Sequence, residues 1–190
     1  MLQVYTGNGK GKTTAAMGLA IRALGAGRKV YIMQFMKSLA YSEQKVLQGF
    51  APKLTLRTSG KPFFIAEEGT LSKALRDKLG DNVVIFPKGK PPQDYMELIN
   101  TGFAEVRSAV SSQEYGLVIL DELNVALHFG LIDREVVEEL LDVVPEDTEM
   151  VLTGRDAPDW LIERADLVTD MQEVKHYYTR GVEARKGIEC

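Results

Sequence analysis

The chain alternates short apolar runs with longer stretches in which apolar residues recur every three or four positions. Six short runs are expected to form strands: residues 2–5, 30–35, 54–56, 117–120, 150–152 and 167–168. Their apolar residues follow one another directly instead of alternating with polar ones. Such runs are typical of strands that are buried on both faces of a parallel sheet. The pattern therefore predicts a mostly parallel sheet with both faces covered.

Four longer stretches have the periodicity of amphipathic helices, and they lie between the expected strands. They span residues 13–26, 95–110, 133–143 and 157–164. Gly25 and Gly27 are suited to ending the first helix, and Pro145 follows the third as a stop. Strands that alternate with helices predict an α/β fold of three layers, in which a central sheet has helices on both faces.

One segment, residues 61–93, shows neither kind of periodicity. It is rich in charged residues, glycine and proline, most clearly at residues 87–92. Long excursions from a compact fold often serve as lids or binding loops. We therefore expect one domain over residues 1–190, with a lid or insertion around residues 61–93.

Composition and charge narrow the class of protein. Of the 190 residues, 45% are hydrophobic and 26% are charged, which is typical of a globular protein. The net charge is −4 and the isoelectric point is about 5.3, which argues against non-specific binding to nucleic acid. Because Cys190 is the single cysteine, one chain can form neither an internal disulfide nor a cysteine-based zinc site. The apolar runs are too short to span a membrane and no leader precedes the first strand, so we expect a cytoplasmic protein without membrane contacts.

A glycine-rich loop joins the first expected strand to the first expected helix, as in a Walker A motif. It consists of Gly7, Asn8, Gly9, Lys10, Gly11, Lys12, Thr13 and Thr14. Its backbone N–H groups and the helix dipole are suited to binding phosphate. Lys12 is expected to contact a phosphate oxygen and Thr13 to bind Mg²⁺. The usual motif begins with glycine where this chain has Thr6, and the alternative interpretation is a solvated glycine-rich turn.

Two carboxylates, Asp121 and Glu122, follow the most apolar of the expected strands. In P-loop proteins a carboxylate at this place helps to hold magnesium. We therefore predict that Thr13, Asp121 and Glu122 provide the site for Mg²⁺ or Mn²⁺, without deciding which acid contacts the ion. The alternative is that both acids only begin the next helix. The loop and the acids together predict a P-loop NTPase fold of the RecA-like type.

Several segments, in order along the chain, resemble the P-loop family of ATP:corrinoid adenosyltransferases. They are residues 7–14, 120–127, 152–158, 165–169 and 174–189. The resemblance is weakest between residues 66 and 93, where this chain is longer, and at Cys190, where the family usually has an aromatic residue. Some members carry a tryptophan in the loop that faces the corrinoid. Residues 60–65 instead resemble the phenylalanine-bearing form of that loop.

The resemblance implies an enzyme that transfers the 5′-deoxyadenosyl group of ATP to the cobalt of a reduced corrinoid and releases triphosphate. Lys12 and Thr13 would act on the triphosphate, with Arg155 as a further nucleotide-binding residue. Phe63 and Phe64 would form an apolar wall against the corrinoid. A homodimer and a flavoprotein electron donor are also implied by the resemblance. Co(I) is a strong nucleophile, so the reaction needs no general base, which agrees with a chain that has two histidines.

Other interpretations stay open at this point. A P-loop ATPase or kinase would cleave a terminal phosphate, and it would need a water-positioning or catalytic-base residue that the sequence does not reveal. A non-catalytic carrier would bind nucleotide or corrinoid without turnover. Phe63 and Phe64 are equally well explained as core residues, and Arg155 as a surface residue paired with Asp156 or Asp159.

Overall fold

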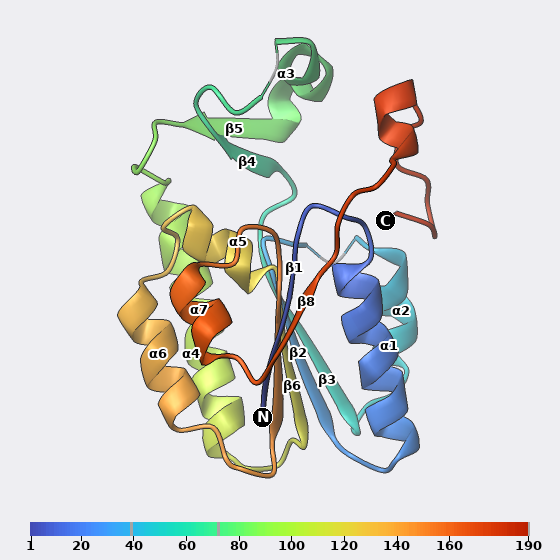
Figure 1. Ribbon diagram of the computed structural model, residues 1–190, viewed down its shortest axis with the longest axis vertical. Coiled ribbons are helices and arrows are strands. Elements are labelled where there is room, and N and C mark those ends of the chain that lie inside the picture. The colour runs from blue at the N-terminus through green and yellow to red at the C-terminus, as the bar shows by residue number, and fades with distance from the viewer. Residues whose placement is uncertain (39, 72, 190) are drawn as a thin grey trace.

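A computed structural model describes residues 1–38, 40–71 and 73–189, and Cys190 lies outside them. At its centre is a sheet of six strands in the order β3-β2-β6-β7-β1-β8 (Figure 1). The strands are β1 (Leu2–Thr6), β2 (Val30–Phe35), β3 (Leu54–Ser59), β6 (Leu117–Asp121), β7 (Glu149–Thr153) and β8 (Leu167–Asp170). All pairings in this sheet are parallel. The six runs predicted as strands therefore form one parallel sheet.

Helices cover both faces of this sheet, which gives the three layers seen in Figure 1. One face carries α1 (Lys12–Gly25) and α2 (Ser42–Gln48), and the other carries α4 (Gln93–Ser111), α5 (Leu123–His128), α6 (Arg134–Asp142) and α7 (Asp159–Arg164). Successive strand residues enter opposite cores. Ile119 packs in the cluster that contains residues of α1, whereas Leu120 packs in the cluster that contains residues of α4. The consecutive apolar residues in the sequence thus supply two cores at once.

Strand β7 lies between β1, which leads into the glycine-rich loop, and β6, which ends at Asp121. One strand inserted between these two is the arrangement found in RecA-like P-loop folds, so the predicted fold class is confirmed. The carboxyl ends of parallel strands lie at the same edge of a sheet. Asp121, Thr153 and the loop after β1 therefore meet at one edge.

Strand β8 differs from its prediction in one respect. The sequence predicts burial on both faces for residues 167–168, and this is wrong, because Leu167 is 45% exposed and Val168 is 39% exposed. The reason is position: β8 is the last strand of the sheet and pairs with β1 alone. An edge strand has a neighbour on one side, so more of its surface stays in water.

The irregular segment forms a small unit outside the central sheet. It contains β4 (Phe64–Glu67), α3 (Lys73–Leu79), a short 3-10 turn η1 (Gly80–Asn82) and β5 (Val83–Phe86). β4 and β5 pair in parallel as a second sheet, which lies beyond the carboxyl ends of the central strands in Figure 1. Ile65 and Phe86 are buried in the same apolar cluster as Tyr95 of α4. The unit is therefore attached to the main body through shared core residues.

Candidate active site

The glycine-rich loop packs against the chain that follows β8. The Gly9 N–H donates to the Met171 carbonyl at 2.5 Å. Gly7 has a φ of 90°, and a Cβ at Gly7 or Gly9 would lie 2.5 Å from the Met171 oxygen. Both positions therefore require glycine because another backbone approaches closely. Thr6, which replaces the first glycine of the usual motif, accepts a hydrogen bond from the Ala157 N–H through its hydroxyl at 3.3 Å.

Lys12 begins α1, and its side chain lies along the loop. Its Nζ donates to the carbonyl oxygens of Gly7 at 2.5 Å and Gly9 at 2.8 Å. Burial lowers the pKa of Lys12, and Arg155 lowers it further, while Glu122 acts in the opposite direction. The ammonium thus lies within the loop, where a bound phosphate oxygen would compete with the two carbonyls.

Asp121 is fully buried at the end of β6 and accepts four side-chain hydrogen bonds. Its Oδ1 accepts from the hydroxyls of Thr13 at 2.9 Å and Thr153 at 2.7 Å. Its Oδ2 accepts from Gln34 Nε2 at 3.0 Å and Lys37 Nζ at 2.7 Å. Burial raises the pKa of Asp121, but Lys37 and these hydrogen bonds outweigh burial and hold the pKa below its ordinary value. Asp121 is therefore an ionised carboxylate, and its hydrogen bond fixes the position of the Thr13 hydroxyl.

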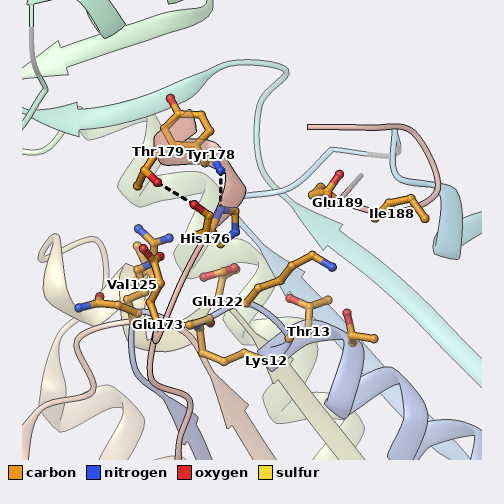
Figure 2. A pocket seen from close by; sticks show the side chains of 16 residues that line it. Lys12, Thr13, Glu122, Val125, Glu173, His176, Tyr178, Thr179, Ile188 and Glu189 are labelled. Carbon is orange, nitrogen blue, oxygen red and sulfur yellow. Dashed lines mark hydrogen bonds between the residues drawn. The ribbon is translucent and has the colours of Figure 1, made fainter. Parts of the chain in front are cut away.

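Glu122, the next residue, has a contrasting environment. Its φ of 63° is in the left-handed region, and such strained residues are concentrated at functional sites. Burial raises the pKa of Glu122 and the charge of Asp121 raises it further, against the lowering effect of Lys37 and Lys12. Among the described residues none donates a hydrogen bond to its carboxylate, and the side chain lines a pocket (Figure 2). Glu122 is therefore the carboxylate that is free to meet a ligand.

The oxygens of Thr13, Asp121 and Glu122 suit a hard divalent cation. Within residues 1–38, 40–71 and 73–189, no group of three or more His, Cys, Asp or Glu side chains is arranged to hold a metal. Mg²⁺ typically takes one or two carboxylates and completes its shell with water and substrate phosphates. The donor set thus fits Mg²⁺ or Mn²⁺ whose remaining ligands are water molecules or nucleotide phosphates.

The pocket has a volume of about 690 Å³ and lies between the glycine-rich loop and the C-terminal tail. In Figure 2, Lys12, Thr13 and Glu122 lie on one side of it, and His176, Tyr178 and Thr179 lie on the other. Besides residues 8–14, the lining consists of Glu122, Val125, Arg155, Glu173, His176, Tyr178, Thr179, Ile188 and Glu189. A pocket of this size accommodates a nucleotide-sized ligand.

The tail side of the pocket is held by local hydrogen bonds around η2 (Tyr177–Arg180). His176 Nδ1 accepts from the Tyr178 N–H at 3.0 Å. Arg185 donates to Glu189 through its backbone N–H at 2.8 Å and its Nη2 at 3.0 Å, and the Tyr177 hydroxyl donates to the same carboxylate. The tail is therefore a structured wall of the pocket.

Arg155, which the sequence predicts to bind nucleotide, follows β7 and lines the pocket. The turn before it is fixed by Asn124, whose Nδ2 donates to the Gly154 carbonyl at 3.0 Å. In the part of the chain that the structure describes, Arg155 forms no ion pair with Asp156 or Asp159. Its guanidinium is instead close enough to Lys12 and Glu122 to affect the pKa of each. This placement favours a role in the pocket over a role as a paired surface residue.

Phe63 and Phe64 are not among the residues that line this pocket. Phe63 is half-buried and packs edge-on against Tyr95, with ring centroids 6.2 Å apart. Phe64, on β4, is 59% exposed. Phe63 is therefore partly a core residue, as one interpretation of the sequence expects, whereas Phe64 is exposed to solvent and is not a core residue.

Several residues of the site carry no signal in the sequence. Lys37, Gln34 and Thr153 surround Asp121 although they lie 84, 87 and 32 positions away from it. Their proximity comes from strand order, because β2 and β7 flank β6. The C-terminal tail that forms one wall of the pocket does have a sequence signal, because residues 174–189 are among the segments that resemble the adenosyltransferase family.

The fold and this site define a P-loop nucleotide-binding protein. The family model of "ATP:corrinoid adenosyltransferase BtuR/CobO/CobP" matches residues 1–190. The chain belongs to this family, which is a family of transferases that use ATP and a corrinoid.

Named relatives agree with this assignment. A corrinoid adenosyltransferase of Pseudomonas aeruginosa is 32% identical over 190 residues, which cover 100% of this chain and 83% of the relative. One of Sinorhizobium sp is 31% identical over 192 residues, covering 100% of this chain and 79% of the relative. One of Escherichia coli K12 is 28% identical over 187 residues, covering 98% and 83%. Within the described residues, no helix is both long and apolar enough to cross a membrane.

Proposed function

We propose that this chain transfers the 5′-deoxyadenosyl group of ATP to the cobalt of a reduced corrinoid and releases triphosphate. The observation that carries the proposal is the pocket, in which the glycine-rich loop, Glu122 and Arg155 meet in a chain that matches the family throughout. In this reaction the Co(I) electron pair forms the bond to the ribose C5′. The bond from C5′ to oxygen breaks, and its electrons leave with the triphosphate.

The task of the protein is then to place the two substrates in line and to stabilise charge on the leaving triphosphate. The loop N–H groups, Lys12 and Arg155 are suited to binding the phosphates, together with Asn8, Lys10 and Thr14 of the loop. None of these roles requires a general base, because the cobalt nucleophile carries no proton to be removed. His176 and the other tail residues would enclose the nucleotide from the opposite side.

Mg²⁺ or Mn²⁺ would be held by the Thr13 hydroxyl and the Glu122 carboxylate, with Asp121 acting through Thr13. When bound, the ion would neutralise phosphate charge. Glu122 is favoured over Asp121 as the direct ligand because both oxygens of Asp121 already accept hydrogen bonds from protein side chains. Asp121 would orient the Thr13 hydroxyl by accepting its hydrogen.

The corrinoid would bind against Phe64 and the neighbouring edge of Phe63. An exposed aromatic ring in the small β4–β5 unit is suited to covering an apolar corrinoid face. A wall of this kind would exclude water and the lower axial ligand from cobalt, which would ease reduction of Co(II). The homodimer, the flavoprotein electron donor and the cytoplasmic location expected from the sequence stay predictions.

Product analysis tests the proposal directly. The full-length protein is mixed with ATP, Mg²⁺ and chemically reduced cobalamin, and both products are quantified. We expect adenosylated corrinoid and intact triphosphate in equal amounts. Release of ADP and orthophosphate in stoichiometric amounts would instead identify an ATPase or kinase, and binding without turnover would identify a carrier.

A further inference from the structure

Lys37 lies in the loop after β2, and its ammonium is inserted between two groups of the candidate metal site. Its Nζ is 2.7 Å from Asp121 Oδ2 and 3.2 Å from Thr13 Oγ1. The Lys37 side chain is 11% exposed and that of Asp121 is fully buried. The pair is therefore a buried ion pair, unlike surface pairs such as Lys29 with Glu114, whose side chains are 50% and 58% exposed.

The hydrogen bonds of Thr13 show what Lys37 does to its hydroxyl. That hydroxyl has one hydrogen, and it is donated to Asp121 Oδ1 at 2.9 Å. The Lys37 ammonium donates to the lone-pair side of the same oxygen. A metal ion that binds Thr13 also needs a lone pair of this oxygen. Lys37 thus uses one of the two lone pairs of Thr13 Oγ1, and a metal ion on the other would lie directly beside the ammonium.

Electrostatic repulsion makes it unfavourable for the Lys37 ammonium and a divalent cation to bind Thr13 at the same time. An ammonium and a divalent cation bound to one oxygen would lie a few ångströms apart, and like charges at that distance repel strongly in a buried site. Lys37 has a further contact that it can keep when it leaves Thr13, because its Nζ also lies over the ring of Tyr41, 5.2 Å from the ring centroid. Asp121 also gives the ammonium a contact that does not involve Thr13.

We propose that Lys37 is a positioning residue that competes with the divalent cation for the Thr13 hydroxyl, so that metal binding displaces its ammonium from Thr13. Before the metal binds, Lys37 neutralises Asp121 and donates to Thr13 Oγ1, whose orientation is set by its own hydrogen bond to Asp121. This proposal rests on the metal site of the proposed function and adds to it a residue that controls when the site is available.

The test measures binding of Mn²⁺ alone, without nucleotide, from the paramagnetic resonance signal of free Mn²⁺. In Lys37→Met the competing charge is gone, so we expect Mn²⁺ to bind about tenfold more tightly than to the wild type. Lys37→Arg keeps the charge and should stay close to the wild type. Lys29→Met, which breaks an exposed ion pair, is the matched control and should change nothing. A residue that only supports the fold would give the opposite sign, because its loss would weaken metal binding.

A double variant ties the effect to this site. Adding Glu122→Gln to Lys37→Met should remove the gain in Mn²⁺ affinity. Equal, weaker or unmeasurable Mn²⁺ binding by Lys37→Met would overturn the proposal, as would a gain that survives in the double variant. Mn²⁺ affinity does not depend on which bond of ATP is cleaved, so product analysis of the wild type tests the proposed function separately.

The wild-type protein provides a second measurement in case Lys37→Met does not fold. Amine labelling followed by mass spectrometry compares the reactivity of Lys37 with that of Lys29. Saturating Mn²⁺ should increase labelling of Lys37 relative to Lys29, because displacement from Thr13 makes the amine more accessible. Unchanged or decreased labelling would overturn the proposal.

Discussion

Asp121 and Glu122 are neighbours in the sequence, yet the fold gives their carboxylates different tasks. Asp121 is enclosed by hydrogen-bond donors, which lower its pKa despite burial, whereas burial and the charge of Asp121 raise the pKa of Glu122. Glu122 also has a left-handed φ of 63°, whereas Asp121 ends strand β6. One carboxylate thus holds the site together, and the other faces the ligand.

Substitution of the two acids should therefore have different consequences. Asp121→Asn leaves the Lys37 ammonium without its buried partner, and we expect it to lower the free energy of unfolding by about 3–5 kcal/mol. Glu122→Gln removes a charge that burial and Asp121 disfavour, so stability should not fall, but Mg²⁺-dependent adenosylation should drop strongly. Urea unfolding and a Mg²⁺ titration of the rate measure both effects. Equal losses of stability in the two variants would contradict this division of tasks.

Lys12 makes a separate prediction about rate. Lys12→Ala removes a positive charge from the site of the developing triphosphate, and the loss of one such electrostatic contact typically costs about 10²–10³ in rate. The measurement is single-turnover adenosylation with preformed Co(I), and Lys29→Ala, at an exposed lysine outside the pocket, is the control. A near-normal rate for Lys12→Ala would mean that triphosphate is bound elsewhere.

At the residue scale, the sequence is informative where the chemistry is local. The loop from Gly7 to Thr14 is recognisable because its spacing is continuous and because a strand precedes it. Lys37 and Gln34 are not recognisable, because they reach Asp121 only once β2 has paired with β6. Contacts that span more than 80 positions leave no spacing that a single sequence can reveal.

At the scale of structural elements, the conformation of the C-terminal tail depends on the carboxylate of Glu189. Hydrogen bonds from Arg185 and Tyr177 lower the pKa of Glu189 from 4.5 to about 2. Because its pKa is lowered, ionised Glu189 stabilises its contacts with Arg185 and Tyr177 fully above pH 4.5. This stabilisation is lost as the pH falls toward about 2. At neutral pH the charged carboxylate therefore holds the tail wall in place.

Glu189→Gln should consequently loosen the tail without affecting the rest of the fold. We expect faster hydrogen exchange over residues 177–189 at neutral pH and a higher KM for ATP, because one wall of the pocket becomes less ordered. Unfolding monitored by the fluorescence of Trp160, in α7, should be unchanged. Glu146→Gln, an exposed carboxylate outside the tail, is the control. Unaltered exchange in the tail would show that Glu189 does not hold it.

The role proposed for the small β4–β5 unit leads to a prediction about the reduction of Co(II) to Co(I). Phe64→Ala should slow adenosylation that starts from Co(II) with a mild reductant, because the axial ligand and water would no longer be excluded from cobalt. With preformed Co(I) the loss should be much smaller. Phe50→Ala, at another exposed phenylalanine, should leave both rates unchanged. Wild-type rates in both assays for Phe64→Ala and Phe63→Ala would place the corrinoid elsewhere.

Elements with strong periodicity are predicted to within about two residues, and weak ones are missed. The helix expected at 95–110 is α4 at Gln93–Ser111, and the helix expected at 133–143 is α6 at Arg134–Asp142. The short α2, β4 and β5 are not predicted. Each has four to seven residues, which is too few for a periodic pattern to stand out, and their conformations depend on packing against α4 and β3.

At the scale of the whole molecule, Phe86 links the β4–β5 unit to the main core. It is 3% exposed and packs edge-on against Phe129, with ring centroids 5.6 Å apart. Phe86→Ala should therefore lower the free energy of unfolding of the entire protein by about 3–5 kcal/mol in a single transition. Phe64→Ala, in the same unit but exposed, should leave stability nearly unchanged. A separate early transition in calorimetry would show that the unit unfolds by itself.

The alternation of strands and helices along the sequence is sufficient to predict an α/β fold, and the glycine-rich loop narrows it to a P-loop fold. The strand order is a different matter, because β1 pairs with β7 and β8 across some 150 residues. The exposure of Leu167 and Val168 follows from that order. Periodicity identifies the strands but does not say which of them pair, so it does not predict this order.

The position of β1 has a consequence for synthesis of the chain. Of the six strands in the central sheet, β1 is synthesised first, and it lies between the two that are synthesised last; its Leu2 pairs with Met150 of β7. During most of translation β1 therefore has no neighbour, and its backbone groups remain open to other partners. The loop that follows it reaches its final shape only after Met171 has been added, because the Gly9 N–H bonds to that residue. The glycine-rich loop of the nucleotide site is thus synthesised before five of the six strands of the central sheet, yet it is completed only after the last of them.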